Sequence, residues 1–176
     1  MKKIIAGVLA LTLVCGFIPF NNNTTDKYTV YAQGETVEYT EGTYGVLNYK
    51  NFGDYIEISN CDVSAIEVEI PSEIDGVAVT NIGISAFGDC EALTSVTIPE
   101  SVTSISGSAF FYCTSLASVT IPDSVTSIGG YAFGFCKNLT SVTIPDNVTS
   151  IGDYAFTSCE ALTSIDVSEA NDYYSS

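Results

Sequence analysis

Carboxylates are the first residues whose type and spacing could do chemistry in this chain. Glu100, Asp123 and Asp146 each follow a proline and stand 23 residues apart. Paired carboxylates can catalyse hydrolysis, and a column of them could hold a cation weakly. Aspartate is also an ordinary turn residue, however, and a turn after the proline explains all three positions. Because the sequence has no histidine, Ser-His-Asp and Cys-His catalysis are excluded. We therefore expect a protein that is not an enzyme.

Cysteines form a second regular series. Cys90, Cys113, Cys136 and Cys159 recur every 23 residues, and no Cys-x-x-Cys pair exists. This spacing does not match a zinc site, so we expect no metal and no cofactor. Because the four residues occupy one slot of successive repeats, they should form a buried column of free thiols that pack as small apolar groups. Cys61 lies outside this series and could be a reactive thiol.

Small hydroxyl residues make up the third regular series and are the candidate binding site. Side chains alternate between the two faces of a strand, so residues between the core positions should line an exposed, concave sheet. Serine and threonine are also what an uncommitted strand face would carry, and the large aromatic or arginine anchors typical of protein recognition are missing. Ser164 and Asp166 would continue the two columns. The candidate residues are Ser95, Thr97, Ser118, Thr120, Ser141 and Thr143.

The element that positions all of these residues is a 23-residue repeat. In three copies a leucine begins a β-branched run that ends at a proline, as in residues 116–122, and in the last copy Ser168 replaces the proline. This run predicts a short strand, which the proline terminates. A turn, a second extended piece and a glycine corner should follow. Ser108 to Cys113 then has room for about one helical or 3₁₀ turn. A fixed period of this length predicts a solenoid.

Aromatic residues fall into two groups. Phe87, Phe110, Phe133 and Phe156 follow the period and should form a buried column. A second group breaks the period, so some of its members should lie on the surface near the short helical turns. Scattered exposed aromatics are normal, whereas a cluster would suggest a contact site. The second group is Phe111, Tyr112, Tyr131, Phe135 and Tyr154.

The N-terminal part of the chain predicts export. Residues 1–32 combine a basic start, an apolar run over 4–20 and small residues before Gln33, as in a signal peptide cleaved after Ala32. No later stretch is apolar enough to cross a membrane. The remaining chain has 20 acidic residues and two lysines, a net charge near −18. Such a charge repels nucleic acid, so we expect no nucleic-acid partner.

The sequence divides into a cap and a solenoid. Val46 to Lys50 and Tyr55 to Ser59 flank a turn and predict a hairpin within a cap of residues 33–64. The solenoid should run over 65–176, with repeats at 65–92, 93–115, 116–138 and 139–161 and a partial one at 162–176. After residue 167 the period is lost. We therefore expect the chain to be incomplete at its C-terminal end, and its open last rung to fray or to self-associate.

The repeat resembles the BspA-type leucine-rich repeat family of exported and cell-surface proteins. The resemblance rests on the pattern of residues 139–159, Leu-Thr-Ser-Val-Thr-Ile-Pro through Ala-Phe to Cys, and covers about 65–176. It implies a mainly β, curved solenoid with short strands on one face, short helical turns on the other and an N-terminal hairpin cap. It also implies a secreted or cell-surface binding or adhesion module, with a protein or glycan partner outside the cell.

Two other functions remain open at this point. The chain could be an accessory or scaffold segment of a larger exported protein, for example a polysaccharide-degrading one. The regular Ser-x-Thr arrays could also suit an ice or crystal surface. We rank that function last, because a leucine-rich solenoid is usually curved whereas a crystal surface is flat.

Overall fold

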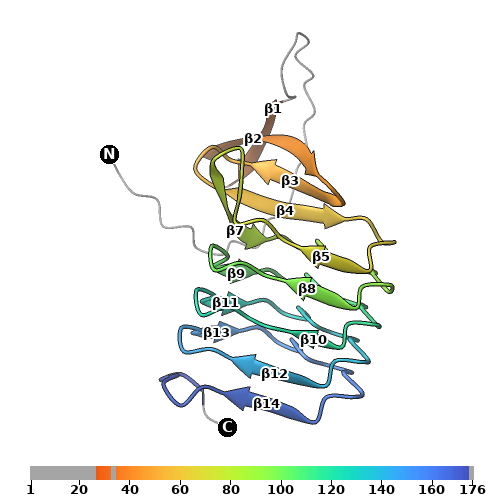
Figure 1. Cartoon of the computed structure of the whole chain (residues 1–176). Coiled ribbons are helices and arrows are strands. Elements are labelled where there is room, and N and C mark those ends of the chain that lie inside the picture. Colours follow the sequence, from red (N-terminus) through yellow and green to blue (C-terminus); the bar gives the residue numbers. More distant parts are fainter. Residues whose placement is uncertain (1–26, 33–34, 175–176) are drawn as a thin grey trace.

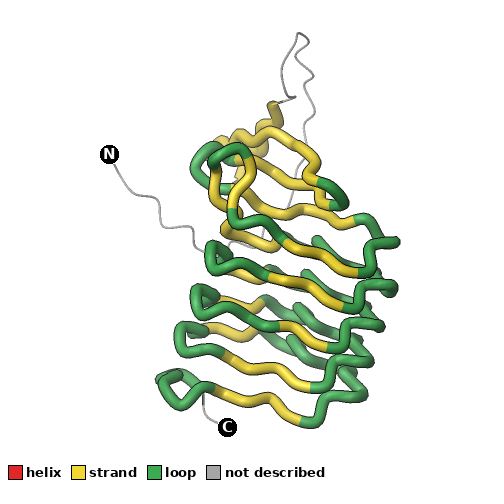
Figure 2. Tube along the Cα trace, viewed as in Figure 1, coloured by secondary structure: helices red, strands yellow, loops and turns green. Residues whose placement is uncertain are grey.

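The computed structural model describes residues 27–32 and 35–174, which form a stack of strands with no helix among them (Figures 1 and 2). In the repeats the strands are two to four residues long after β7, as expected when each repeat is a single thin layer of the stack. The strands are β1 (Lys27–Ala32), β2 (Glu35–Tyr44), β3 (Leu47–Asn51), β4 (Ile56–Cys61), β5 (Glu67–Glu69), β6 (Glu73–Ile74), β7 (Val77–Ile82), β8 (Ser95–Thr97), β9 (Ser104–Ile105), β10 (Ser118–Val119), β11 (Ser127–Ile128), β12 (Ser141–Ile144), β13 (Ser150–Ile151) and β14 (Ser164–Val167).

Strands β1 to β4 form an antiparallel sheet at the N-terminal end of the stack (Figure 1). β3 and β4 pair at the place where the sequence predicts a hairpin. β4 then pairs in parallel with β7, so this sheet continues directly into the repeats and covers the first one. β1 lies inside the range predicted as a signal peptide and pairs only with β2. Residues 1–26 of that range lie outside the described part of the chain.

The repeats stack in register as two columns of parallel strands. One column runs through β7, β9, β11 and β13, where each residue pairs with the residue 23 positions away, as in Ser127 with Ser104 and Ser150. The other column contains β5, β8 and β10, followed by β12 and β14. The amide of Thr140 donates to the carbonyl of Ala117 at 3.2 Å and joins these two groups. We call each repeat layer a rung.

The predicted helical turn between Ser108 and Cys113 is absent, and a third hydrogen-bonded column replaces it. The amides of Ala109, Phe111 and Cys113 close tight turns onto carbonyls three residues back. The amides between them, those of Ser108, Phe110 and Tyr112, donate instead to the next rung at 2.7–2.9 Å. A helix would use every amide internally. The turn segment therefore depends on its neighbouring rung, which no local sequence signal reveals.

Left-handed backbone explains why these turns cannot continue as a helix. Ser108 has φ of 56° and Tyr112 has φ of 63°. A right-handed helix requires φ near −63° at every residue. The same two slots are left-handed in all four full repeats. The other pairs are Ser85 and Asp89, Tyr131 and Phe135, and Tyr154 and Ser158.

The core is built from columns of identical side chains. Phe87, Phe110 and Phe133 have no solvent exposure, and their rings stack at centroid distances of 4.8 and 5.1 Å. Phe156 continues the stack at 5.5 Å from Phe133. Offset stacking at this spacing suits aromatic rings and matches the separation of neighbouring strands. The predicted phenylalanine column is therefore present.

The first repeat is longer than the others because it contains an extra hairpin. β6 and β7 pair antiparallel around Asp75 and Gly76, which have φ of 52° and 78°. Asp-Gly with both residues left-handed is the favoured two-residue hairpin connection. The five additional residues of this repeat thus extend a hairpin and leave the stacking of the later rungs unchanged.

Candidate binding faces

The six predicted hydroxyl residues lie together on β8, β10 and β12 and in the loop position that follows β10. Ser118 on β10 pairs with Ser95 on the neighbouring strand β8, and Ser141 on β12 pairs with Ser164 on β14. Thr97 pairs with Glu69 and Thr143 pairs with Asp166. All six side chains are exposed except that of Ser95, which is partly buried. We call them the hydroxyl face: Ser95, Thr97, Ser118, Thr120, Ser141 and Thr143.

The hydroxyls of this face make no hydrogen bond to the rest of residues 27–32 and 35–174. Threonines next to the strands behave differently. The Thr140 hydroxyl donates to the Ala117 carbonyl at 3.3 Å, and the Thr126 hydroxyl donates to the Thr103 carbonyl at 3.2 Å. Serine and threonine hydroxyls both donate and accept. The hydroxyl face is therefore free to bond outward, whereas the neighbouring threonines join the rungs.

Acidic residues mark the two ends of the hydroxyl face. Glu67 pairs with Ser95 and Glu69 pairs with Thr97 at the N-terminal end. Asp166 closes the C-terminal end, where its carboxylate accepts a hydrogen bond from the Ser164 hydroxyl at 3.3 Å. The centre of the face is neutral and its ends are negative.

The carboxylates after the prolines stand in exposed turns. Asp123 follows Pro122 inside a turn that the Val125 amide closes onto the Pro122 carbonyl at 3.0 Å. Glu100 and Asp146 stand in equivalent turns and are exposed. Within the described residues no group of three or more acidic or cysteine side chains could hold a metal ion. Turn formation accounts for these residues, as the sequence suggests.

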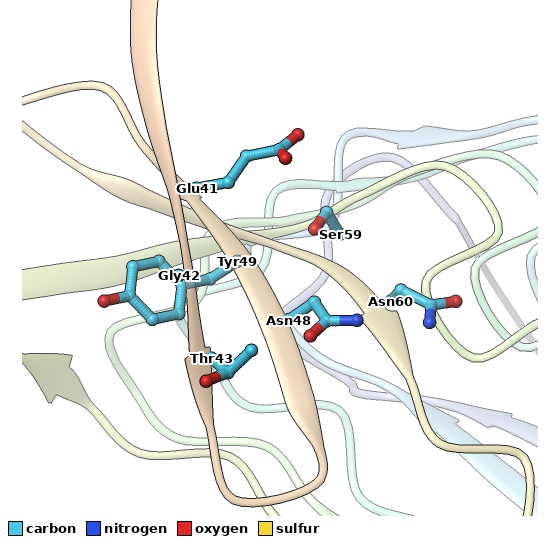
Figure 3. A pocket seen from close by; sticks show the side chains of 7 residues that line it. All are labelled: Glu41, Gly42, Thr43, Asn48, Tyr49, Ser59 and Asn60. Atoms are coloured by element: carbon cyan, nitrogen blue, oxygen red, sulfur yellow. The ribbon is translucent and has the colours of Figure 1, made fainter. Parts of the chain in front are cut away.

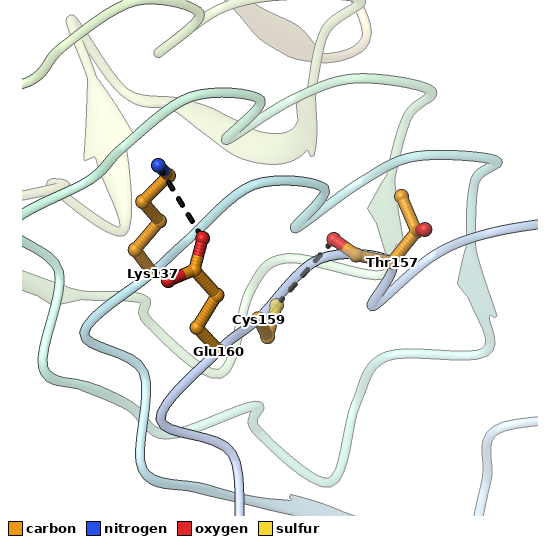
Figure 4. Close-up of polar contacts among 4 residues, drawn as sticks. All are labelled: Lys137, Thr157, Cys159 and Glu160. Atoms are coloured by element: carbon orange, nitrogen blue, oxygen red, sulfur yellow. Dashed lines mark hydrogen bonds and ion pairs between the residues drawn. The ribbon is translucent and has the colours of Figure 1, made fainter.

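The repeat cysteines are free thiols, and three of the four are hydrogen-bonded to the rung before them. The thiols of Cys113, Cys136 and Cys159 donate to the carbonyls of Phe87, Phe110 and Phe133 at 3.0–3.2 Å. Burial raises the pKa of Cys136 to about 12 and also raises the pKa of Cys113. Cys159, near the exposed Lys137–Glu160 ion pair of 3.4 Å, is less buried than the others (Figure 4). The column packs the core, and its buried thiols Cys113 and Cys136 stay protonated at neutral pH.

Cys61 belongs to the same column, although the sequence places it outside the repeats. Its side chain is only 1% exposed, and its thiol donates to the Asp62 carbonyl at 3.6 Å and also has a hydrogen bond with the free thiol of Cys90. That bond and burial raise the pKa of Cys61, while the bond lowers the pKa of Cys90. Cys61 is therefore a buried contact between the cap and the first rung, which does not fit a reactive thiol.

The aromatic residues that break the period meet on one surface. Phe111 lies at the centre, with centroid distances of 5.4 Å to Tyr112, 6.3 Å to Tyr131 and 5.3 Å to Phe135. Tyr131 stacks on Tyr154 at 5.1 Å. Tyr112 stacks on Phe135 at the same distance. We call these five residues the aromatic patch. The sequence identifies its members but does not show that they touch, since the contacts join different rungs.

A shallow hollow of about 410 Å³ lies in the cap between β2, β3 and β4 (Figure 3). The ring of Tyr49 covers Gly42, where a Cβ atom would overlap it. Glu41 is the one acidic residue in the lining, beside Asn48, Ser59 and Asn60. Neither a nucleophile with a base nor a phosphate-binding loop lines the hollow, so its chemistry points to no reaction.

No helix in the described residues is long and apolar enough to span a membrane. A family model of the BspA-type leucine-rich repeat region matches residues 57–176 in six copies. No curated protein sequence matches the chain.

Several solved leucine-rich repeat proteins are similar. One from Bacteroides capillosus ATCC 29799 is 30% identical, with 73% of this chain and 98% of that chain covered and a TM-score of 0.67. TpLRR from T. pallidum is 28% identical, with 72% and 71% covered and a TM-score of 0.59. One from Bacteroides ovatus ATCC 8483 is 27% identical, with 73% and 39% covered and a TM-score of 0.53.

The match of the family model confirms the resemblance that the repeat pattern indicates. The stacked 23-residue rungs and the solved relatives agree with it, while the helical turns predicted between strands and corners are absent. The chain belongs to the BspA-type leucine-rich repeat family.

Proposed function

We propose that this protein is a non-enzymatic binding or adhesion module that acts outside the cell, secreted or at the cell surface. The observation that carries the proposal is the hydroxyl face. Its six hydroxyls lie in register on successive rungs, and none is used by the described part of the protein. An extended surface of this kind is what repeat solenoids commonly present to a partner. Membership of a repeat family without catalytic residues supports the same role.

The chemistry of the hydroxyl face favours a polar, extended partner, either a protein segment or a glycan. Serine and threonine hydroxyls can donate to and accept from carbonyl, amide or sugar hydroxyl groups. Neighbouring strands are about 4.8 Å apart, so each column offers one hydroxyl at that interval. Nucleic acid does not fit, because the chain has a net charge of −16 and the face has no cation to neutralise phosphate.

The second candidate is an accessory or scaffold segment of a larger exported protein. The Bacteroides ovatus relative supports it, since this chain covers only 39% of that protein's length. In such a protein the repeats would hold a catalytic domain near its substrate without taking part in the reaction. A catalytic domain in the same reading frame would favour this function over a free-standing adhesin.

Binding to immobilised matrix proteins, mucin and plant glycans tests the main proposal. The double substitution Thr120→Arg/Thr143→Arg places bulky charges on exposed strand positions and should abolish binding with little change in thermal stability. The matched control is Ala92→Arg/Asn138→Arg, which adds the same charge at exposed positions outside the face whose side chains join no rungs. If the control abolishes binding and the test variant retains it, the site lies elsewhere on the solenoid.

A further inference from the structure

The aromatic patch combines exposed rings with an unfavourable backbone. Tyr131 is 40% exposed and Tyr154 is 65% exposed. Tyr112, Tyr131, Phe135 and Tyr154 have φ between 57° and 63°, a region that bulky side chains rarely occupy. The first repeat fills the same slots with Ser85 and Asp89, so the fold itself does not require aromatic residues there. Such strain gathers at functional sites.

A glycine makes room for the centre of the patch. A Cβ atom at Gly134 would lie 3.1 and 3.3 Å from two ring atoms of Phe111, which is tighter than ordinary packing. Gly134 and Phe111 occupy the same slot one rung apart. The small residue in one rung therefore leaves room for the ring of the previous rung, which contacts Tyr131 and Phe135. The cluster is thus assembled from complementary residues of neighbouring rungs.

Acidic residues border the patch, and among residues 27–32 and 35–174 no cation lies over its rings. The amide of Asp89 donates to the Phe111 carbonyl at 2.8 Å, and the amide of Tyr131 donates to the Asp153 carbonyl at 3.0 Å. Both aspartates are exposed and neither has a basic partner in the described residues. Lys137, two positions beyond Phe135, is paired with Glu160. The surface is therefore aromatic at its centre and negative at its edge.

We propose that the aromatic patch binds lysine or arginine side chains of a basic protein segment. A ring attracts a cation placed over its face within about 6 Å. The negative charges of the flanking aspartates attract the same cation. The protein already contains this interaction within its cap, where the ammonium of Lys50 lies 5.2 Å from the ring centre of Tyr39. The net charge of −16 brings basic partners to the surface, and the rings fix where they dock.

This surface comes from a different part of each rung than the hydroxyl face, so the two proposals are independent. Loss of function from Thr120→Arg/Thr143→Arg would say nothing about the patch. Conversely, a patch without basic ligands would leave the proposed role of the hydroxyl face intact.

Fluorescence anisotropy with labelled octa-arginine and octa-lysine peptides tests the inference on the full chain. The test variant is Phe111→Thr/Tyr131→Ser/Tyr154→Ser, in which each new residue is one that another repeat carries in that slot, as in Thr157, Ser85 and Ser108. Net charge is unchanged. We expect roughly tenfold weaker peptide binding, about what two exposed cation–π contacts provide. Trimethylation of the lysines should preserve binding to the wild type, because the quaternary cation still fits an aromatic site.

The matched control is Tyr44→Ser/Tyr173→Ser, which removes two other exposed tyrosines and should bind the peptides as the wild type does. If the triple variant does not fold, Tyr154→Ser alone serves, since its ring is mostly exposed, and it should weaken binding about threefold. Equal binding by test variant and wild type would overturn the inference, because general charge attraction would then explain all of it. If the triple variant lost binding to a neutral glycan but still bound the peptides, the inference would also be overturned, and the patch would be a carbohydrate site.

Discussion

The side chain of Asn171 lies one rung beyond Val148 and fastens the end of the chain to it. Its Nδ2 atom donates to the Val148 carbonyl at 3.1 Å and to the Pro145 carbonyl at 2.7 Å. Its Oδ1 atom accepts from the amides of Tyr173 and Tyr174. The Tyr174 hydroxyl in turn accepts from the Ile151 amide at 2.9 Å. The side chains of Asn171 and Tyr174 thus satisfy backbone groups of the fourth rung that pair with no strand among the described residues.

Asn171→Ala should lower the free energy of unfolding by about 2 kcal/mol, because two hydrogen bonds to buried carbonyls are lost. Hydrogen exchange should become faster in β12 to β14 and stay unchanged in the cap. Glu169→Ala, an exposed neighbour, is the control. Even in the wild type we expect protection to fall from the third repeat towards residue 174, since Ile165 is 41% exposed on the last rung. Uniform protection to residue 167 in the variant would contradict this.

Gly129→Ala should destabilise the stack by about 1–3 kcal/mol, the usual range for overpacking. A Cβ atom there would overlap backbone atoms of Ser106 and Gly107 in the previous rung, and backbone cannot move aside. Gly107→Ala is a matched control, because its Cβ would be 3.4 Å from the Gly130 carbonyl oxygen, an ordinary contact. Thermal melts should give a lower melting temperature for Gly129→Ala than for Gly107→Ala. Equal melting temperatures would contradict the prediction and show that the rungs move apart at little cost.

The repeat cysteines should resist alkylation at pH 8 in the native protein and react fully in urea without a reductant. Cys90, Cys113 and Cys136 are buried, so a reagent cannot reach them in the folded protein, and the thiols of Cys113 and Cys136 also donate to carbonyls. A thiol that stays protonated is a poor nucleophile. Cys159 should react first, because it is the least buried of the four. Mass spectrometry of the labelled peptides gives the order. A need for reductant before labelling in urea would mean disulfides and refute the prediction.

Stability should also fall at alkaline pH. Burial holds the folded pKa of Cys136 at about 12, above its ordinary value of 9.0. The unfolded chain therefore loses this proton first, so the contribution is complete below pH 9 and is lost as pH rises towards 12. Urea denaturation at pH 7 and pH 10.5 should show the decrease. Cys136→Ala should show a smaller decrease between the same two pH values, and an equal one would assign the effect to other groups.

The exported form should begin at Gln33 if residues 1–32 are a signal peptide. Removal of these residues takes away β1, which pairs only with β2, so the rest of the cap should stay folded. N-terminal sequencing of protein recovered from the medium checks the cleavage site. Retention of residues 1–32 in that protein would disprove the prediction.

Much of the fold follows from the repeat alone, because a strict period places Phe110 over Phe87 and Ser118 beside Ser95. The predicted helical turn is wrong, because the amides of Ser108 and Phe110 donate to the next rung and not within their own turn. The sequence of a single repeat does not contain this information. The aromatic patch does not follow from the sequence as a unit for the same reason, because Phe111 meets Tyr131 across two rungs, beside the space that Gly134 leaves. Asn171 was overlooked although it stands 23 residues after Val148.

The identical rungs of the hydroxyl face have a consequence for how a ligand would be held. A chain molecule bound across Ser118 and Ser141 meets the same groups after sliding by one rung, about 4.8 Å. Binding in several equivalent positions raises the total affinity through their number, and a longer ligand gains further contacts within one molecule. Such a face would distinguish ligands by their length more than by their sequence. Glu67, Glu69 and Asp166 set the limits of the sliding range.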